Sequence, residues 1–175
     1  MAIDNNVLVA WLTAKDQEIS YTKLQYGLKQ LEENKQRLII PTPVLAEFLV
    51  VANNARYDFI ERLSKSKAVN LAAFDARCAV ECSLLTASAR AKEDKFYGAE
   101  PEEGLRQKIK IDEQIVAIAR VNRCETILTH DKDIHNIAKR VGIRAIRVAD
   151  LPFPPQAAQL TIAGMPENTQ NPASS

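Results

Sequence analysis

Short apolar runs typical of strands alternate with stretches of helical periodicity along most of the chain. The strand-like runs, rich in branched apolar side chains, are residues 2–3, 38–40, 69–71, 126–128 and 143–148. Between them, apolar residues recur at spacings of three and four, which is typical of amphipathic helices. Strands separated by helices pair in parallel, and both faces of such a sheet must be covered. We therefore predict an α/β fold, a three-layer α/β/α sandwich whose central parallel sheet has about four or five strands.

The helical stretches have recognisable ends. We expect helices over residues 6–12, 21–31, 44–51, 59–63, 75–85, 112–119 and 134–141. Asp75 is expected to cap its helix at the N-terminus, and Gly142 to end the last one. Residues 94–110 hold two glycines and a proline among polar side chains. This composition predicts a loop there, with Asp112 opening the helix that follows.

Composition divides the chain into two parts. Residues 1–151 hold the alternating pattern and are expected to form one domain, which suits a length of 175 residues. Residues 152–175 contain five prolines among glutamines, asparagines and serines, with a single charge at Glu167. Such a segment buries too little apolar area to offset the entropy lost on ordering, so we expect a flexible tail.

The cellular setting follows from what the sequence contains and lacks. Three cysteines, a low and odd number, argue against a disulfide framework and fit a reducing compartment. The first residues carry no basic segment ahead of an apolar run, and no apolar stretch is long enough to cross a bilayer. We therefore expect a cytoplasmic protein with no membrane association.

Acidic residues follow the predicted strands. Asp4 comes directly after residues 2–3, and Glu47 lies early in the helix after residues 38–40. Asp131 and Asp133 follow residues 126–128, and Asp112 lies at the expected start of its helix. Sites in open parallel sheets form beyond the carboxyl ends of the strands, so these side chains are expected to meet at one edge.

Converging carboxylates repel one another unless a cation lies among them. Mg²⁺ and Mn²⁺ take oxygen ligands and favour in-line displacement at phosphorus, so the pattern favours metal-assisted phosphodiester hydrolysis. The alternative for Asp4, Asp112 and Asp131, each considered alone, is a helix N-cap. Glu47 could instead face solvent between the apolar residues of its helix.

Four segments together resemble the PIN-domain ribonucleases, and among them the VapC-type toxins. Residues 3–9 are similar to the family's opening Asp-Thr-Asn-Val-Leu, and residues 43–47 to its second acidic motif. Residues 112–119 resemble Asp-x-x-Ile-x-Ala-x-Ala, and residues 129–134 resemble Thr-x-Asp-x-Asp-Phe. The resemblance covers residues 1 to about 151. Asn5 departs from the usual Thr or Ser, and Ile134 from the usual Phe.

The resemblance implies a metal-dependent endoribonuclease with Mg²⁺ or Mn²⁺ as its cofactor. It implies a catalytic quartet of Asp4, Glu47, Asp112 and Asp131. It implies metal ligation by Asp4, Asp112, Asp131 and Asp133, with Glu47 holding or deprotonating the attacking water. It also implies that Asn6 and Thr129 orient the acids.

Basic residues near these motifs are candidates for contacts to RNA phosphates. They are Arg106, Lys108, Lys110 and Lys132. A formal net charge of +1 gives no sign of a strongly basic chain. Within residues 1–151, however, 23 basic residues face 17 acidic ones once the quartet is set aside. A modestly basic surface around an acidic pocket is what a phosphate-binding enzyme requires.

The resemblance also implies partners: an RNA substrate, a homodimer and an antitoxin protein, as in a toxin–antitoxin pair. Tyr21, Leu24 and Leu28 are expected to form the surface for such a partner. The alternative is a non-catalytic PIN-like module that binds RNA or a protein. No phosphate-binding glycine motif and no thiol–imidazole pair is present, which disfavours nucleotide cofactors and cysteine chemistry.

Overall fold

Five parallel strands form one sheet in the order β3-β2-β1-β4-β5. The computed structural model describes residues 1–13, 19–91 and 103–155. The strands are β1 (Ala2–Ile3), β2 (Leu38–Pro41), β3 (Val69–Ala72), β4 (Thr126–Leu128) and β5 (Arg144–Ile146). The shortest strand, β1, lies at the centre, where Ala2 pairs with Ile39 on one side and Ile127 on the other.

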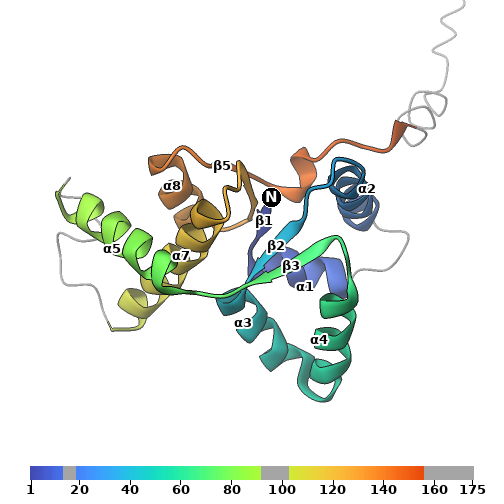
Figure 1. The fold of residues 1–175 in the computed structure, drawn as a ribbon, viewed down its shortest axis with the longest axis horizontal. Coiled ribbons are helices and arrows are strands. Elements are labelled where there is room, and N and C mark those ends of the chain that lie inside the picture. Colours follow the sequence, from blue (N-terminus) through green and yellow to red (C-terminus); the bar gives the residue numbers. More distant parts are fainter. Residues whose placement is uncertain (14–18, 92–102, 156–175) are drawn as a thin grey trace, which may run out of the picture.

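Helices connect the strands and cover the sheet on both faces (Figure 1). The first group is α1 (Asn5–Thr13), α2 (Ile19–Glu33), α3 (Thr42–Ala52), η1 (Asn53–Ala55) and α4 (Arg56–Lys65). The second group is α5 (Ala76–Ala91), α7 (Glu103–Val121), α8 (Lys132–Arg140) and η2 (Val148–Asp150).

The strand order fixes which helices share a face. Parallel crossovers are right-handed, so connections that run from β1 out to β3 lie on one face, and those that run back through β4 to β5 lie on the other. Accordingly, α1 contacts α2 and α3, whereas α7 contacts α5 and α8. In Figure 1, α5, α7 and α8 gather on the side of the sheet away from α1 and α4. The predicted three-layer α/β/α sandwich is confirmed.

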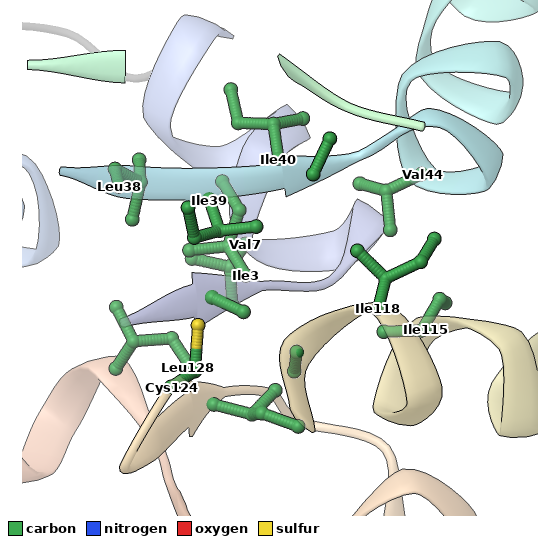
Figure 2. Packing of buried hydrophobic residues seen from close by; sticks show 14 of the residues in the cluster. Ile3, Val7, Leu38, Ile39, Ile40, Val44, Ile115, Ile118, Cys124 and Leu128 are labelled. Atoms are coloured by element: carbon green, nitrogen blue, oxygen red, sulfur yellow. The ribbon is translucent and has the colours of Figure 1, made fainter. Parts of the chain in front are cut away.

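The core lies between the sheet and these helices. Ile3 and Leu128 come from the two neighbouring strands, Val7 comes from α1, and Ile118 comes from α7; none of the four is more than 1% exposed. Figure 2 shows Ile118 and Val44 approaching each other where α7 meets α3. Because the buried face of α7 packs in the core, the helix has a fixed position relative to the strands.

The loop predicted over residues 94–110 is wrong for residues 103–110, which form the first turns of α7. Residues 92–102 lie outside the described part. Packing favours the helix there, because Ile109 is only 7% exposed and α7 contacts α5. Asp112 therefore lies in the interior of α7 and not at its start, so the N-cap interpretation of Asp112 is also wrong.

The partner surface predicted on Tyr21, Leu24 and Leu28 is wrong for Leu24, which is buried, and stays a prediction for the other two residues. Leu24 is 5% exposed and belongs to the core, while Tyr21 and Leu28 are half-buried. The apolar stripe of α2 faces inward because it covers the sheet beside β1. Large apolar side chains that are exposed in the described part are Ile19, Val50, Val51, Tyr57, Val80, Leu84 and Phe153.

The described start of the predicted tail packs against α2. The Lys23 ammonium donates a hydrogen bond to the carbonyl oxygen of Ala149 and lies 4.3 Å from the centroid of the Phe153 ring. Leu151, which lies between Ala149 and Phe153 along the chain, is buried. The chain as far as Phe153 therefore packs against the domain. The rest of the tail, residues 156–175, lies outside the described part. Among the described helices, none has both the length and the apolar character needed to cross a bilayer.

Candidate metal centre

Asp4 combines two roles at the carboxyl end of β1. Its side chain is 2% exposed, and its Oδ1 accepts a hydrogen bond of 2.9 Å from the backbone N–H of Val7 in the first turn of α1. This is the geometry of a helix N-cap. Its other oxygen, Oδ2, accepts a hydrogen bond from the hydroxyl of Thr129. The N-cap alternative is therefore confirmed for Asp4, but the cap uses only Oδ1 and leaves Oδ2 for Thr129.

Thr129 joins two acidic residues across neighbouring strands. It is 3% exposed and lies just beyond β4, where its N–H donates to the carbonyl oxygen of Ile146 over 2.9 Å. Its hydroxyl donates a hydrogen bond to Asp4. The same hydroxyl accepts a hydrogen bond of 2.9 Å from the backbone N–H of Asp131. One hydroxyl thus uses its donor and an acceptor position to hold Asp4 and Asp131 at a fixed separation.

Asp131 is the N-cap of α8. Its Oδ1 accepts a 2.7 Å hydrogen bond from the backbone N–H of Asp133. Burial favours the neutral carboxyl, but this hydrogen bond and the nearby Lys108 ammonium outweigh burial and lower the pKa of Asp131 below its ordinary value. Asp131 is therefore held ionised, and its Oδ2 is directed away from the helix cap.

Asp112 reaches the same place from the interior of α7. Its side chain is 5% exposed, and its buried Oδ2 has no hydrogen-bond partner among the described residues. Burial raises the pKa of this carboxyl to about 7; the Asp131 and Asp133 carboxylates act in the same direction, and Lys108 opposes them. A buried carboxylate oxygen without a partner is costly, and a bound cation would give this oxygen a partner.

Asp112, Asp131 and Asp133 form one cluster. A carboxylate oxygen from each lies within 4.8 Å of the oxygens from the other two. Oxygens on opposite sides of a Mg²⁺ ion are about 4 Å apart, so small side-chain rotations suffice for a shared ion. The donor set is all oxygen, and Asp112 also carries the buried Oδ2 that has no hydrogen-bond partner among the described residues. These residues fit a hard divalent cation such as Mg²⁺ or Mn²⁺.

Lys108 provides the positive charge that the cluster has in this structure. Its Nζ lies 2.6 Å from Oδ2 of Asp133 and 3.1 Å from Oδ2 of Asp131. Since Lys108 precedes Asp112 by four residues on α7, helix geometry places the two side chains on one face. The hydrogen bond to Asp133 raises the pKa of Lys108 above its ordinary value, and Asp131 adds to this. From the sequence, Lys108 was predicted only as an RNA contact. Its four-residue spacing from Asp112 could have indicated that its ammonium lies near the acids.

Glu47 stands at the rim of the site. It is exposed in the second turn of α3, and among the charges that raise the pKa of Asp112 its contribution is smaller than those of Asp131 and Asp133. The helix α3 contacts α7, which accounts for this contribution. The alternative that Glu47 faces solvent and the prediction that it joins the acids are thus both compatible with its position.

For Asn6, Lys110 and Lys132, no hydrogen bond or ion pair joins the side chain to the acids of the cluster within the described ranges. Asn6 is exposed in the first turn of α1 and makes no hydrogen bond to an acidic side chain within the described ranges. Lys110 and Lys132 are exposed on α7 and α8. The side chain of Arg106 lies outside the described part of the molecule.

The cysteines do not form a second reactive site. Cys78, Cys82 and Cys124 are free thiols, and Cys78 and Cys124 are buried. Burial raises the pKa of Cys82 to about 11 and also raises the pKa values of Cys78 and Cys124. A thiol nucleophile needs a lowered pKa, so these side chains serve as small apolar groups.

The Thr129 link generates a stability prediction. Thr129→Val keeps the shape of the side chain but leaves the buried Oδ2 of Asp4 and the Asp131 N–H without their partner. We expect the free energy of unfolding to fall by about 3 kcal/mol. Urea denaturation in the presence of EDTA measures it.

The matched control is Thr126→Val, in β4 and half-buried, whose side chain makes no hydrogen bond to another described residue. It should change the free energy of unfolding by no more than about 0.5 kcal/mol. Equal losses in the two variants would show that the link contributes nothing beyond strand packing.

Similarity to known proteins agrees with this geometry. The family model of the PIN domain matches residues 1–140. A chain in the crystal structure of VapBC2 from Rickettsia felis, bound to a DNA fragment from their promoter, has a similar fold, with a TM-score of 0.56 and 16% sequence identity. The similarity covers 83% of this chain and 96% of that chain. No curated protein matches this sequence. Because the family model spans most of the sequence, the chain belongs to the PIN domain family.

Proposed function

We propose that this protein is a metal-dependent endoribonuclease that hydrolyses RNA phosphodiester bonds with Mg²⁺ or Mn²⁺. The observation that carries the proposal is the cluster of Asp112, Asp131 and Asp133, in which Asp112 has a buried carboxylate oxygen without a hydrogen-bond partner among the described residues. A set of oxygen donors at the carboxyl edge of a parallel sheet is suited to a hard cation and a phosphate ester. Membership of the PIN domain family supports the same class of chemistry.

The roles of the side chains follow from their positions. Asp112, Asp131 and Asp133 would hold the ion, which supplies an activated water and stabilises charge on the phosphate oxygens. Asp4 holds Asp131 in place through the Thr129 hydroxyl, and so acts on the ligands from behind. Glu47, exposed on α3, would hold the attacking water or accept a proton from it.

Partners follow the same proposal. The similar chain belongs to an assembly named VapBC2, and we propose that this protein is likewise the toxin of a toxin–antitoxin pair, with a second copy of itself and an antitoxin as partners. Exposed apolar side chains on α3 and α4, namely Val50, Val51 and Tyr57, give such partners a surface in place of the stripe of α2.

Loss of Asp112 should abolish cleavage. Asp112→Asn keeps the volume of the side chain but removes a charged ligand, so we expect RNA cleavage with Mn²⁺ to fall at least about a hundredfold. The control is Asp58→Asn, an exposed acid in the first turn of α4, away from the cluster. Gel-based cleavage of single-stranded RNA measures both variants. Cleavage that survives Asp112→Asn, or that persists in excess EDTA, would contradict the mechanism.

The same protein can be tested against the non-catalytic alternative by melting. Binding of an ion to the native state alone raises the melting temperature with ion concentration. A nuclease with this centre is expected to gain stability when Mn²⁺ is added, and Asp112→Asn to gain much less. A protein that binds RNA but shows no response to Mn²⁺ would favour the non-catalytic module.

Lys108 should compete with the ion for the cluster. Lys108→Met removes the ammonium from Asp131 and Asp133, so we expect Mn²⁺ to bind about tenfold more tightly, measured by isothermal titration calorimetry. Without Mn²⁺ the variant should melt at a lower temperature than the unchanged protein, because the carboxylates then repel one another. Lys110→Met, an exposed lysine on the same helix, is the control and should change neither value. Unchanged affinity in Lys108→Met would show that the ammonium and the ion occupy different places.

A further inference from the structure

A polar pocket of about 220 Å³ lies beside the acidic cluster and has no role in the mechanism described above. It shares Asp131 with the cluster, and Thr129, which holds Asp131, also lines it. Its other walls come from His130, from Lys132, His135 and Asn136 on α8, and from Arg147 after β5. Two separate segments of the chain line the pocket, residues 129–136 and Arg147, so the pocket is not formed by the N-terminus of α8 alone.

The charge of the pocket is suited to an anion. Lys132 and Arg147 are exposed, and neither side chain pairs with an acidic group among the described residues. Asp131 is the single acid in the described wall, and both of its oxygens are engaged elsewhere, one by the N–H of Asp133 and the other by Lys108. Two cations therefore face the pocket without compensation, and the N-terminal end of α8 adds partial positive charge.

The remaining walls are suited to a nucleobase. His130 and His135 carry flat rings, and the Arg147 guanidinium is also planar; unpaired bases stack on groups of both kinds. The amide of Asn136 offers a donor and an acceptor to a base edge. A base can reach these groups only when it is unstacked and unpaired, which favours a single strand over a duplex.

We propose that this pocket binds one nucleotide of single-stranded RNA next to the phosphodiester held at the acidic cluster. Lys132 and Arg147 bind its phosphate, and His130, His135 and Asn136 receive its base. The wall of Thr129 and Asp131 places the nucleotide directly beside the reacting group. This inference rests on the proposed function, because it assumes that RNA is the molecule that enters the site.

The test is RNA binding in EDTA, where no cleavage interferes. Fluorescence anisotropy with a labelled short single-stranded RNA of mixed sequence gives the affinity of the full chain. The variant carrying both Lys132→Gln and Arg147→Gln should bind about tenfold more weakly. The slope of log affinity against log salt should also become shallower by about 1.4, as expected for two lost phosphate contacts on a single strand. His135→Ala should bind about fivefold more weakly, because stacking on its ring is lost.

The matched control carries Lys139→Gln and Arg144→Gln, which remove the same charge from α8 and β5 outside the pocket. It should retain the affinity of the unchanged protein. Equal losses in the control and in the pocket variant would overturn the proposal, since binding would then depend on overall charge alone. Binding of duplex RNA as tightly as single-stranded RNA would also overturn it.

The two proposals fail in different ways. If the unchanged protein cleaves RNA with Mn²⁺ but the pocket variants bind and cleave as it does, the pocket proposal is wrong and the nuclease stands. If the pocket variants lose RNA binding in EDTA while no preparation cleaves RNA, the pocket stands and the nuclease proposal is wrong.

Discussion

Repulsion among carboxylates held a few ångströms apart, at a partly buried edge of the sheet, is the constraint on which this site depends. Asp4 is relieved by the Val7 N–H and the Thr129 hydroxyl, and Asp131 by the Asp133 N–H and Lys108. Asp112 has no such partner for its Oδ2; burial raises its pKa to about 7, and the Asp131 and Asp133 carboxylates add to this. Hydrogen bonds and the Lys108 ammonium thus stabilise Asp4, Asp131 and Asp133, and the repulsion that remains is among Asp112, Asp131 and Asp133. An ion bound there would remove the remaining repulsion.

Much of the fold and the place of the acids could be predicted from the sequence. The strands are short apolar runs between amphipathic segments, so their number and parallel pairing followed from the alternation itself. Parallel pairing then implied that Asp4 and Asp131, each just beyond a strand, would share one edge. The structure confirms this through the Thr129 hydroxyl, which contacts both residues. Periodicity and topology are local or generic properties, which is why a single sequence reveals them.

What could not be predicted depends on contacts between distant segments. The sequence at the start of α7 predicted a loop because its polar residues outnumber its apolar ones, whereas the structure has a helix in which Ile109 is buried. The extended helix carries Lys108 to Asp131 and Asp133, so the counterion of the centre came from a segment misjudged as a loop. The burial of Leu24 on α2 likewise depends on distant residues, since Leu24 lies beside Ile3 and Leu128 of the sheet.

The measurement that tests the central claim most directly is anomalous diffraction from crystals grown with Mn²⁺. The account predicts an anomalous peak bonded to carboxylate oxygens of Asp112 and Asp131, at about 2.2 Å, with the Lys108 ammonium displaced from its present position between Asp131 and Asp133. A structure at saturating Mn²⁺ with no peak in the cluster, and with Lys108 still paired to both acids, would contradict it.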